Sequence, residues 1–548
     1  MLNFSLSHIP GTVDACPLEG QMHLRFRVRK GLLRSAALIY QCNKNRWHIE
    51  RFTAPMICAF SDSELDYFYG AVPLTDRRFA YIFELHCADG KTRFLCEEGL
   101  TERFDHDLGY FNFFQYCSQF ACDRMTVPDW VRSAVCYQIF PERFAVGKSK
   151  KDTAYITDPW GALPTPKSYF GGDLRGIAEH LEHLEHLGCN VLYLTPVFCS
   201  PTNHKYEITD YCHVDPAFGG DEALLELTKK AHSMGIRVML DGVFNHCSVG
   251  HPFFVDAQKR GKDSPYYNWF LWLEDGSYET FGSVKTMPKL NTGERAVIEY
   301  FCGVARDWMK RCGIDGWRLD VSDEISHKFL RAFREAVLEQ RPDAIIIGED
   351  WHRAAHYLNG DQYDGIMNYG LTKALLDLLA FGTLDAAGFR DRLVRLYHCY
   401  SLAANEKMLN LLGSHDTHRF LTRVSGDKQK LRTALAILFF YPGIPCVYYG
   451  DEIGLSGGYD PDCRRCFDWN EENWDQETFR LIARLSRYKK EPALSLGQFS
   501  ITENEGIVTL RRSAAAQQLT LRVNGTGRPK EGLAPYGFEI IEKQEDEP

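Results

Sequence analysis

GWRLDVSDE, residues 316–324, combines the alternation of a buried strand with charges that such a strand rarely holds. Because side chains alternate across a strand, Arg318 and Asp320 lie on one face, and Trp317 and Leu319 lie on the other, apolar face. Burying an arginine with an aspartate costs several kcal/mol in desolvation, which their ion pair need not return in full. The stretch therefore predicts a core strand whose tip carries a charged pair for a reason other than stability.

The composition is that of a soluble globular protein with several domains. The chain has 548 residues, an apolar fraction of 45% and an aromatic fraction of 13%, so roughly three or four folding units are expected. Its net charge of -10 comes without a basic run, which argues against nucleic acid as a partner. No apolar stretch reaches the roughly 18 residues of a membrane span. The acidic net charge without a basic run fits a protein that binds a neutral or small substrate.

The 18 cysteines are spread through the predicted strands and helices, and we expect them to be reduced thiols in a reducing compartment. The N-terminal stretch MLNFSLSHIPG has no basic region followed by a long apolar run, so we expect no secretory signal. Cys463 and Cys466 form a CRRC pair that is either a redox or half-zinc motif or two ordinary thiols. No second pair completes a zinc site, which favours ordinary thiols. A cytoplasmic protein is the resulting expectation.

The pattern along the chain predicts three domains. Residues 1–122 alternate apolar and polar side chains, as in MHLRFRVRKG, and predict a β-sandwich. Residues 123–492 alternate strand-like and helix-like segments, with a Tyr/Gly/Ser-rich insertion at 247–292 after the third strand. Residues 493–548 alternate again and predict a small C-terminal β-domain.

Eight strand-like segments, each followed by a helix, fit a (β/α)8 TIM barrel, an α/β fold, better than an open sheet. The predicted strands lie within AVCYQIF (134–140), NVLYLTPV (190–197), IRVMLDGVF (236–244), GWRLDV (316–321), AIIIGED (344–350), DGIMNYG (364–370), KMLNLLGSHD (407–416) and IPCVYYGDEIG (444–454).

The C-terminal ends of barrel strands form the active site in this fold. These ends carry Asp241, Arg318 with Asp320, Glu349 with Asp350, and His415 with Asp416. A purely structural arrangement needs about one acid for each arginine. The surplus of acidic residues over arginines at these strand ends therefore indicates a catalytic role.

Hydrolysis of a glycosidic bond needs two carboxyl groups, one ionised and one protonated. Arg318 is expected to hold Asp320 ionised as a nucleophile, because a nearby opposite charge lowers the pKa of a carboxyl group. Glu349 follows Ile-Ile-Ile-Gly, an apolar approach that suits a protonated general acid. Asp416 is placed to stabilise an oxocarbenium-like transition state.

Four ordered motifs resemble the α-amylase superfamily, glycoside hydrolase family 13, in its cyclomaltodextrinase, neopullulanase and maltogenic amylase group. They are DGVFNH (241–246), GWRLDVSDE (316–324), GED (348–350) and LLGSHDTHR (411–419). The insertion contains MPKLN (287–291), which resembles the marker of that group. The N-terminal sandwich resembles the group's starch-binding-type domain.

The resemblance implies a role for each matching residue. Asp320 resembles the nucleophile, Glu349 the general acid/base and Asp416 the transition-state stabiliser. The implied substrate-binding residues are Tyr206, His246, Arg318, Trp351, His415, Asp460 and Arg464. We expect Asp241 to support the site through hydrogen bonds.

The family implies a retaining α-glucan hydrolase that cleaves α-1,4 bonds of cyclomaltodextrins, maltooligosaccharides and pullulan-type substrates. It also implies a homodimer formed through the N-terminal domain. The loop AVGKSKKD (145–152) holds lysines where some relatives bind calcium, and a hard cation prefers oxygen ligands, so we expect no metal and no cofactor there.

Two further departures from the family pattern bear on the site. VSDE (321–324) replaces the VANE that the group often has, and the added Asp323 bears on acceptor preference. Asp350 follows the acid where an apolar residue is usual, and we expect its side chain to point away from Glu349. An α-glucan transferase, a secreted amylase and a non-catalytic carbohydrate-binding barrel stay open as alternatives.

Several polar residues have plain structural explanations. His180, His183 and His186 recur every three residues among glutamates, which predicts a solvated helix face more than a metal site. Asp451 and Glu452 follow the eighth strand, and we expect them to be structural.

Overall fold

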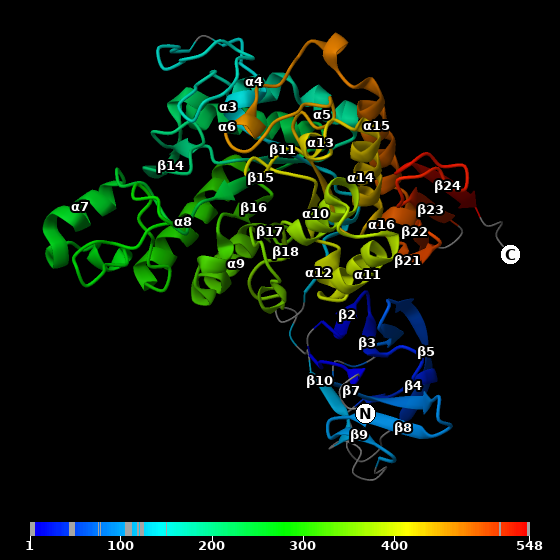
Figure 1. The fold of residues 1–548 in the computed structure, drawn as a ribbon. Helices are drawn as coiled ribbons and strands as arrows, with labels where there is room; N and C mark the ends of the chain where they lie inside the picture. Colours follow the sequence, from blue (N-terminus) through cyan, green and yellow to red (C-terminus); the bar gives the residue numbers. More distant parts are fainter. Residues whose placement is uncertain are drawn as a thin grey trace.

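The computed structural model has three folded regions along the chain (Figure 1). It describes residues 6–11, 13–42, 50–74, 76, 78–104, 112–117, 120, 125–149, 151–514 and 517–544. The N-terminal sheets (blue) lie below a central barrel, and the C-terminal sheet (red) lies at the side of the barrel. In these residues no helix combines the length and apolarity needed to span a membrane.

The described N-terminal strands pair antiparallel and fold over into two layers. They are β1 (Leu6–Ser7), β2 (Ala15–Leu18), β3 (Gln21–Arg29), β4 (Leu33–Cys42), β5 (Arg51–Ser61), β6 (Leu65–Pro73), β7 (Arg78–Cys87), β8 (Thr92–Cys96), β9 (Gly99–Thr101) and β10 (Phe114–Cys117). Alternate residues Met22, Leu24 and Phe26 of β3 are buried. Phe26 contacts Phe83 of β7 with ring centroids 5.0 Å apart, although β6, β5 and β4 separate these strands in the sheet. The predicted sandwich is confirmed.

Parallel strands form the central barrel between residues 136 and 448. They are β11 (Cys136–Ile139), β12 (Val191–Leu194), β15 (Arg237–Gly242), β16 (Gly316–Leu319), β17 (Ile345–Gly348), β18 (Gly365–Ile366), β19 (Leu409–Leu411) and β20 (Ile444–Tyr448). Met367 bridges Leu409 in parallel, which joins β18 to β19 and closes the ring. The (β/α)8 barrel is therefore confirmed.

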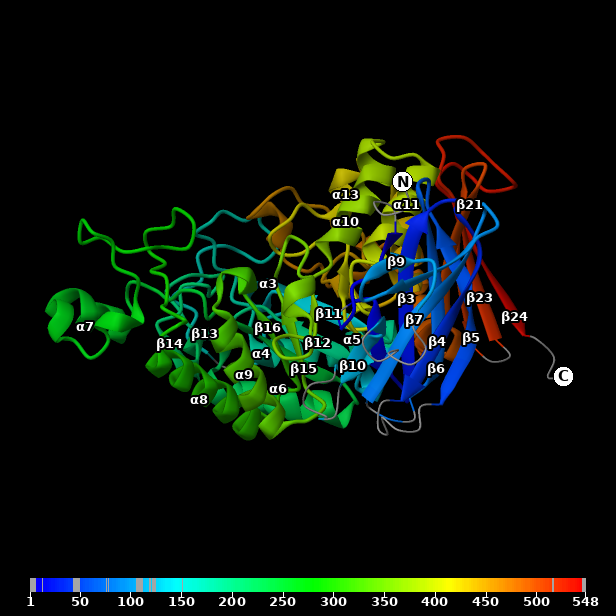
Figure 2. The same ribbon diagram turned by 90° about the horizontal axis from the view of Figure 1, so that it is seen from below.

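Helices cover the outside of the barrel, with α6, α8 and α9 along one side (Figure 2). The longer helices are α4 (Leu174–Glu179), α5 (Leu181–Leu187), α6 (Gly220–Ser233), α7 (Pro252–Arg260), α8 (Arg295–Cys312), α9 (His327–Gln340), α10 (Tyr369–Leu376), α11 (Ala386–Tyr397), α14 (Lys428–Phe440) and α15 (Gln476–Lys489). Short helices are α2 (Asp129–Arg132), α3 (Pro141–Phe144), α12 (Leu402–Asn405), α13 (Phe420–Arg423) and α16 (Pro492–Ser495).

The apolar stripe of α8 shows how these helices attach. Phe301 and Trp308 lie seven residues apart on its buried face, as the helical repeat requires. Phe301 packs on Phe244, with ring centroids 4.9 Å apart, and Phe244 in turn contacts Trp317 of β16. The helix ends at Gly313, whose φ of 68° lies in the left-handed region that glycine adopts readily.

The connection from β15 to α8 is long and carries α7, which projects away from the N-terminal region (Figures 1 and 2). Main-chain bridges pair His246 with Lys289 and Phe270 with Leu290. The MPKLN segment (287–291) therefore lies beside the end of the third barrel strand.

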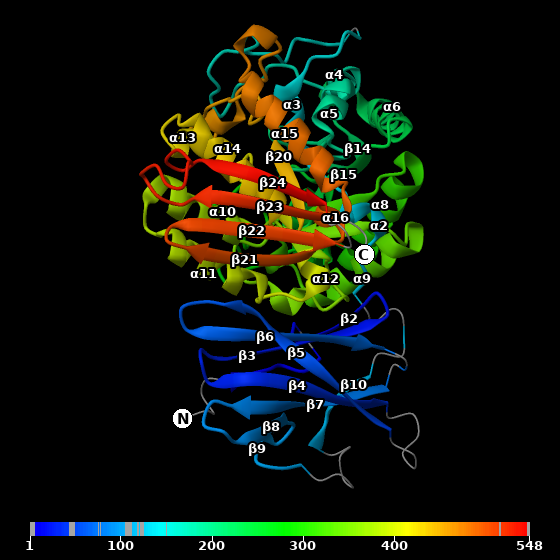
Figure 3. The same cartoon turned by 90° about the vertical axis from the view of Figure 1, so that its right-hand side faces the viewer.

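The C-terminal residues form an antiparallel sheet of β21 (Gln498–Asn504), β22 (Ile507–Ala514), β23 (Gln517–Asn524) and β24 (Phe538–Gln544). Figure 3 shows this sheet against the barrel, with β21 next to the N-terminal region. Phe499 of β21 contacts Phe60 of β5, with ring centroids 6.1 Å apart. Arg395 of α11 donates to Asp62 at 2.9 Å. The N-terminal region therefore contacts both the C-terminal sheet and the barrel helix α11.

The alternation predicted for residues 316–319 is present in β16. Trp317 and Leu319 are buried in the core shared with the helices. Arg318 is also fully buried, but its guanidinium contacts Asp241 and Asp320 at the C-terminal end of the strands. The charged face therefore points into the barrel.

The solvated face predicted for the histidines of 180–186 is wrong for His183. Its side chain is buried, and its Nε2 lies 2.8 Å from Oε1 of Glu452. Tyr137 donates to the same oxygen at 2.5 Å. The helix also breaks at His180, so His183 lies on a separate short helix, α5. Glu452 is therefore structural, as expected, through a buried pair rather than a loop cap.

Asp315 precedes β16 at the opposite end of the strand from the charged tip and offers a stability test. His232 Nε2 and the Val238 N–H each lie 2.8 Å from its carboxylate. Burial raises the pKa of Asp315, but the His232 and Val238 hydrogen bonds and the Arg341 charge outweigh it, so the net shift is downward.

We expect Asp315→Asn to lower the free energy of unfolding by about 2 kcal/mol at neutral pH, because hydrogen bonds to a charged acceptor are lost. A depressed folded-state pKa contributes stability above the unfolded value of about 3.9, and that stability disappears as the pH falls. Urea unfolding at pH 7 and at pH 3, below the unfolded pKa, measures the difference. A gap between variant and wild type that widened on acidification would contradict this reading.

Candidate active site

The C-terminal ends of the barrel strands open into one cleft with a volume of about 1010 Å³. Of the predicted residues, the cleft is lined by Tyr206, His246, Asp320, Glu349, Trp351, Asp416, Asp460 and Arg464. Arg318 and His415 are fully buried beneath it. The barrel therefore brings residues from distant stretches of the chain into one site.

Arg318 is the centre of the charged cluster. Its NH1 contacts Asp241 at 2.9 and 3.0 Å and Asp320 at 2.8 Å. Its NH2 lies 2.8 Å from Oε2 of Glu349, an ion pair that is not aligned as a hydrogen bond. Asp320 and Glu349 thus share one guanidinium. Asp241 accepts hydrogen bonds from the same guanidinium, as expected.

The charges in this cluster differ from the prediction that Arg318 pairs with Asp320 alone and holds it ionised. Burial raises the pKa of Asp320 well above its usual range, Arg318 opposes the rise, and the carboxylates of Glu349 and Asp241 add to it. Burial likewise raises the pKa of Asp241 to about 6. One guanidinium divided among three carboxyl groups does not hold all of them ionised. This cluster favours retention of a proton, which an acid–nucleophile pair requires.

The backbone after β16 also positions Glu349. Val321 has a φ of 46°, a conformation that a β-branched residue rarely adopts. Its N–H donates to Oε2 of Glu349 at 3.0 Å, and the Ser322 hydroxyl donates to the Glu349 carbonyl at 2.8 Å. No sequence signal marks Val321 as strained, because the strain exists only in the folded loop.

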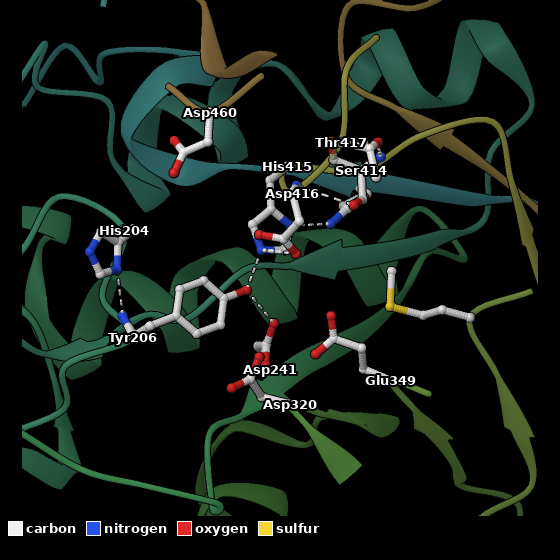
Figure 4. A network of polar contacts seen from close by, with 12 residues as sticks. His204, Tyr206, Asp241, Asp320, Glu349, Ser414, His415, Asp416, Thr417 and Asp460 are labelled. Carbon is white, nitrogen blue, oxygen red and sulfur yellow. Dashed lines mark hydrogen bonds and ion pairs between the residues drawn. The ribbon is translucent and has the colours of Figure 1, made fainter. Parts of the chain in front are cut away.

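His415 and Tyr206 lie side by side in the polar network at the cleft (Figure 4). Their rings are parallel within 7° with centroids 5.4 Å apart. His415 Nε2 lies 2.5 Å from the Tyr206 hydroxyl and 3.2 Å from Oδ2 of Asp416. Tyr206 donates in turn to Oδ2 of Asp241 at 3.1 Å. A continuous polar network therefore joins Asp416 to the Arg318 cluster.

Arg464 holds the other side of Asp416. Its NH2 lies 3.3 Å from Oδ1 of Asp416, and its NH1 lies 3.0 Å from Oδ1 of Asp460. Figure 4 shows Asp460 across the cleft from Glu349. Two acids and an arginine thus present polar atoms to one end of the cleft, a set suited to sugar hydroxyl groups.

His246 and Trp351 supply flat surfaces to the cleft. The ring of His246 stacks on Phe281 with centroids 5.0 Å apart, and its buried Nε2 has no partner among the described residues. Trp351 is 48% exposed and stacks on Tyr369 at 3.8 Å, within 5° of parallel. The combination of apolar faces and an unused polar atom fits a carbohydrate ligand.

Several residues that line the cleft were not predicted from the sequence. They are His204, Phe281, Tyr369, His418 and Tyr459. His204 lies in NHKYEITDY, two residues before Tyr206, so the motif offered a signal for it. Tyr369 offered none, because only the stack on Trp351 brings it into the site.

The two unusual acids have different positions. Asp350 is buried outside the cleft lining, and its Oδ1 accepts the His352 N–H at 2.8 Å. Asp323 lines the cleft, and burial together with Asp350 raises its pKa.

Among the described residues no group of three or more His, Cys, Asp or Glu side chains could hold a metal ion. Cys463 and Cys466 are both buried free thiols.

Paired acids at the C-terminal mouth of a (β/α)8 barrel, bounded by aromatic faces, define a glycoside hydrolase. The family model for the α-amylase catalytic domain matches residues 138–490, and the model for the α-amylase N-terminal Ig-like domain matches residues 1–117. The chain belongs to the α-amylase family, in the group of cyclomaltodextrinases, neopullulanases and maltogenic amylases.

Individual relatives match over most of their length. A cyclomaltodextrinase of Geobacillus thermopakistaniensis is 42% identical over 483 residues, which are 86% of this chain and 81% of the relative. The intracellular maltogenic amylase of Bacillus subtilis (strain 168) is 37% identical over 500 residues, 89% of this chain and 84% of the relative. A solved cyclomaltodextrinase structure superposes with a TM-score of 0.89 at 38% identity and covers 96% of this chain and 92% of its own.

Proposed function

We propose that this chain is a retaining α-glucan hydrolase that cleaves α-1,4 bonds of cyclomaltodextrins, maltooligosaccharides and pullulan-type substrates. The observation that carries the proposal is the contact of both Asp320 and Glu349 with the single guanidinium of Arg318. That contact holds two carboxyl groups next to one another on one cleft wall, as a double displacement requires.

In the proposed reaction Asp320 attacks the anomeric carbon and forms a glycosyl ester. Glu349 gives its proton to the departing glycosidic oxygen as the bond to that oxygen breaks. In the second step Glu349 accepts a proton from water, and the water oxygen replaces Asp320 on the anomeric carbon. Two inversions leave the product with the anomeric configuration of the substrate.

The remaining residues serve the sugar ring in this proposal. Asp416 lies between His415 and Arg464 and stabilises the positive charge that develops at the ring. Asp460 and Arg464 bind sugar hydroxyl groups, and Tyr206 and Trp351 pack on sugar faces.

Initial rates on β-cyclodextrin, pullulan and soluble starch test the substrate class. We expect β-cyclodextrin and short maltooligosaccharides to be cleaved faster than starch, and proton NMR to detect α-anomeric product first. A strong preference for starch would overturn the small-substrate assignment. Longer oligosaccharides as the dominant products at high maltose concentration would identify a transferase instead.

We further propose a cytoplasmic homodimer formed through the N-terminal domain. Sixteen of the 18 cysteines are free thiols in the structure, which supports a reducing compartment, and the B. subtilis relative is named intracellular. None of the described N-terminal residues lines the cleft, so a role for that domain in access requires a second copy. Sedimentation velocity on the full chain tests the dimer, and a monomer at all concentrations would refute it.

A further inference from the structure

Gln138 lies directly beneath the site without lining the cleft. It is the third residue of β11 and fully buried. By strand alternation it shares the inward face of Cys136, which packs in the barrel interior. Its side-chain Nε2 lies 3.0 Å from Nδ1 of His415. Among the described residues, the side chain of Gln138 contacts the site through that imidazole.

The protonation of His415 follows from its surroundings. Burial and the charges of Arg464 and Arg318 lower the pKa of His415 well below its usual value, so the imidazole is neutral and carries one N–H. Its Nε2 lies 3.2 Å from Oδ2 of Asp416, a carboxylate oxygen that accepts hydrogen bonds and cannot donate when ionised. The proton must therefore lie on Nε2, because two facing lone pairs would repel.

The hydrogen-bond directions of Tyr206 agree with this assignment. Its single hydroxyl proton goes to Oδ2 of Asp241 at 3.1 Å. Its oxygen is then free to accept from His415 Nε2 at 2.5 Å. With the opposite tautomer the hydroxyl proton would turn to His415 and leave Asp241 without it.

A proton on Nε2 leaves Nδ1 as an acceptor that needs a donor. Among the described residues, the only hydrogen-bond partner of Nδ1 is the Gln138 amide. The amide oxygen of Gln138 is buried without a partner in the described chain. Its contact with His415 is therefore, within the described part of the chain, the one side-chain hydrogen bond that orients the amide.

We propose that Gln138 is a positioning residue that fixes His415 as the Nε2–H tautomer, so that His415 donates toward Asp416 and the Tyr206–Asp241–Arg318 network. This inference rests on the proposed function, since it assigns the network to glucan cleavage. The order of donors runs from Gln138 through His415 and Tyr206 to Asp241, which contacts Arg318. The Gln138 amide therefore influences both Asp416, which His415 contacts directly, and the Asp241–Arg318 pair, which His415 reaches through Tyr206.

Two substitutions separate this role from simple packing. Gln138→Met keeps the length of the side chain and removes the donor. We expect kcat to fall about 10- to 100-fold, the range known for residues that orient metal-ligating histidines, with a smaller change in KM. Gln138→Glu restores a partner for Nδ1, but Nε2 stays a donor only if the introduced carboxyl group and His415 share one extra proton. Activity of this variant is then lost as the pH rises through the pKa of that pair.

We expect the alkaline limb of the Gln138→Glu profile to move down by about one pH unit or more relative to wild type. The groups that face His415 and contribute to its titration are Asp416, Glu349, Arg318, Arg464, His204 and, through Tyr206, Asp241. All of them are present in both proteins, so the difference between the two profiles reports position 138.

Asn410→Asp is the matched control. Asn410 is a fully buried amide on β19 that bonds to Asn368 and to the Tyr441 and Pro442 carbonyls. We expect this variant to lose stability and keep the alkaline limb of wild type. A Gln138→Glu profile parallel to wild type, or equal losses in both Gln138 variants at every pH, would refute the positioning role.

A readout that needs no turnover separates this inference from the proposed function. In ¹⁵N-histidine-labelled wild type, with His415→Gln for assignment, we expect His415 Nε2 to resonate as a protonated ring nitrogen and Nδ1 as an unprotonated one. The reverse tautomer would overturn the inference even in an active enzyme. The expected tautomer in a protein without glucan hydrolysis would refute the proposed function and leave the assignment of Gln138 to His415 supported.

Discussion

Replacing Asp320 by asparagine is expected to reduce kcat on maltotriose by about 10⁴-fold or more, the scale of losing a nucleophile. An amide at this position cannot form the glycosyl ester with the anomeric carbon. It still accepts a hydrogen bond from Arg318, which contacts Asp320 at 2.8 Å in wild type. We therefore expect isothermal titration to show maltotriose binding within about threefold of wild type, because binding does not require the ester.

Asp315→Asn is the control for this experiment. Asp315 precedes the same strand at the other end of the barrel and contacts no residue of the cleft cluster. Its replacement should lower stability and keep turnover within a small factor of wild type. If Asp320→Asn retained more than a few per cent of wild-type turnover, the nucleophile would have to be another residue.

Glu349→Gln is expected to lower kcat on maltotriose by about 10² to 10⁴-fold, the range for loss of general acid–base catalysis. The loss should be much smaller for the first step with α-maltosyl fluoride, because fluoride leaves without a proton. Without a base to activate water, the glycosyl ester on Asp320 should then accumulate. Intact-protein mass spectrometry after mixing would detect the added maltosyl mass.

Glu452→Gln is the matched control, since Glu452 is a fully buried glutamate that binds His183 and Tyr137 away from the cleft. We expect it to cleave both substrates at near wild-type rates. Equal losses on maltotriose and on the fluoride in Glu349→Gln would contradict the acid role, because only a proton donor distinguishes these leaving groups.

Local patterns in the chain were sufficient for most of the fold and for the position of the acids. The alternation in residues 316–319 put Arg318 opposite Trp317 and Leu319, and the structure has the same arrangement. The apolar runs before Glu349 and Asp416 identified strand ends correctly. Such predictions succeed because the two-residue repeat of a strand follows from the backbone alone.

Predictions that depended on which side chains contact one another were less accurate. His183 was expected on a solvated face, yet it is buried against Glu452. Arg318 was expected to hold Asp320 ionised, yet it is shared with Asp241 and Glu349. In both cases the missing information was a side chain on a distant segment of the chain.

The sequence by itself determined which residue types lie at the ends of the barrel strands, because the strand and helix repeats depend on residues that are close together in the chain. Only the tertiary structure decided which of them touch. Sharing of one guanidinium by three acids, the stack of Trp351 on Tyr369, and the amide of Gln138 against His415 all join distant segments. These contacts depend on strand register and on closure of the ring, which are set by packing of the whole core rather than by any local stretch.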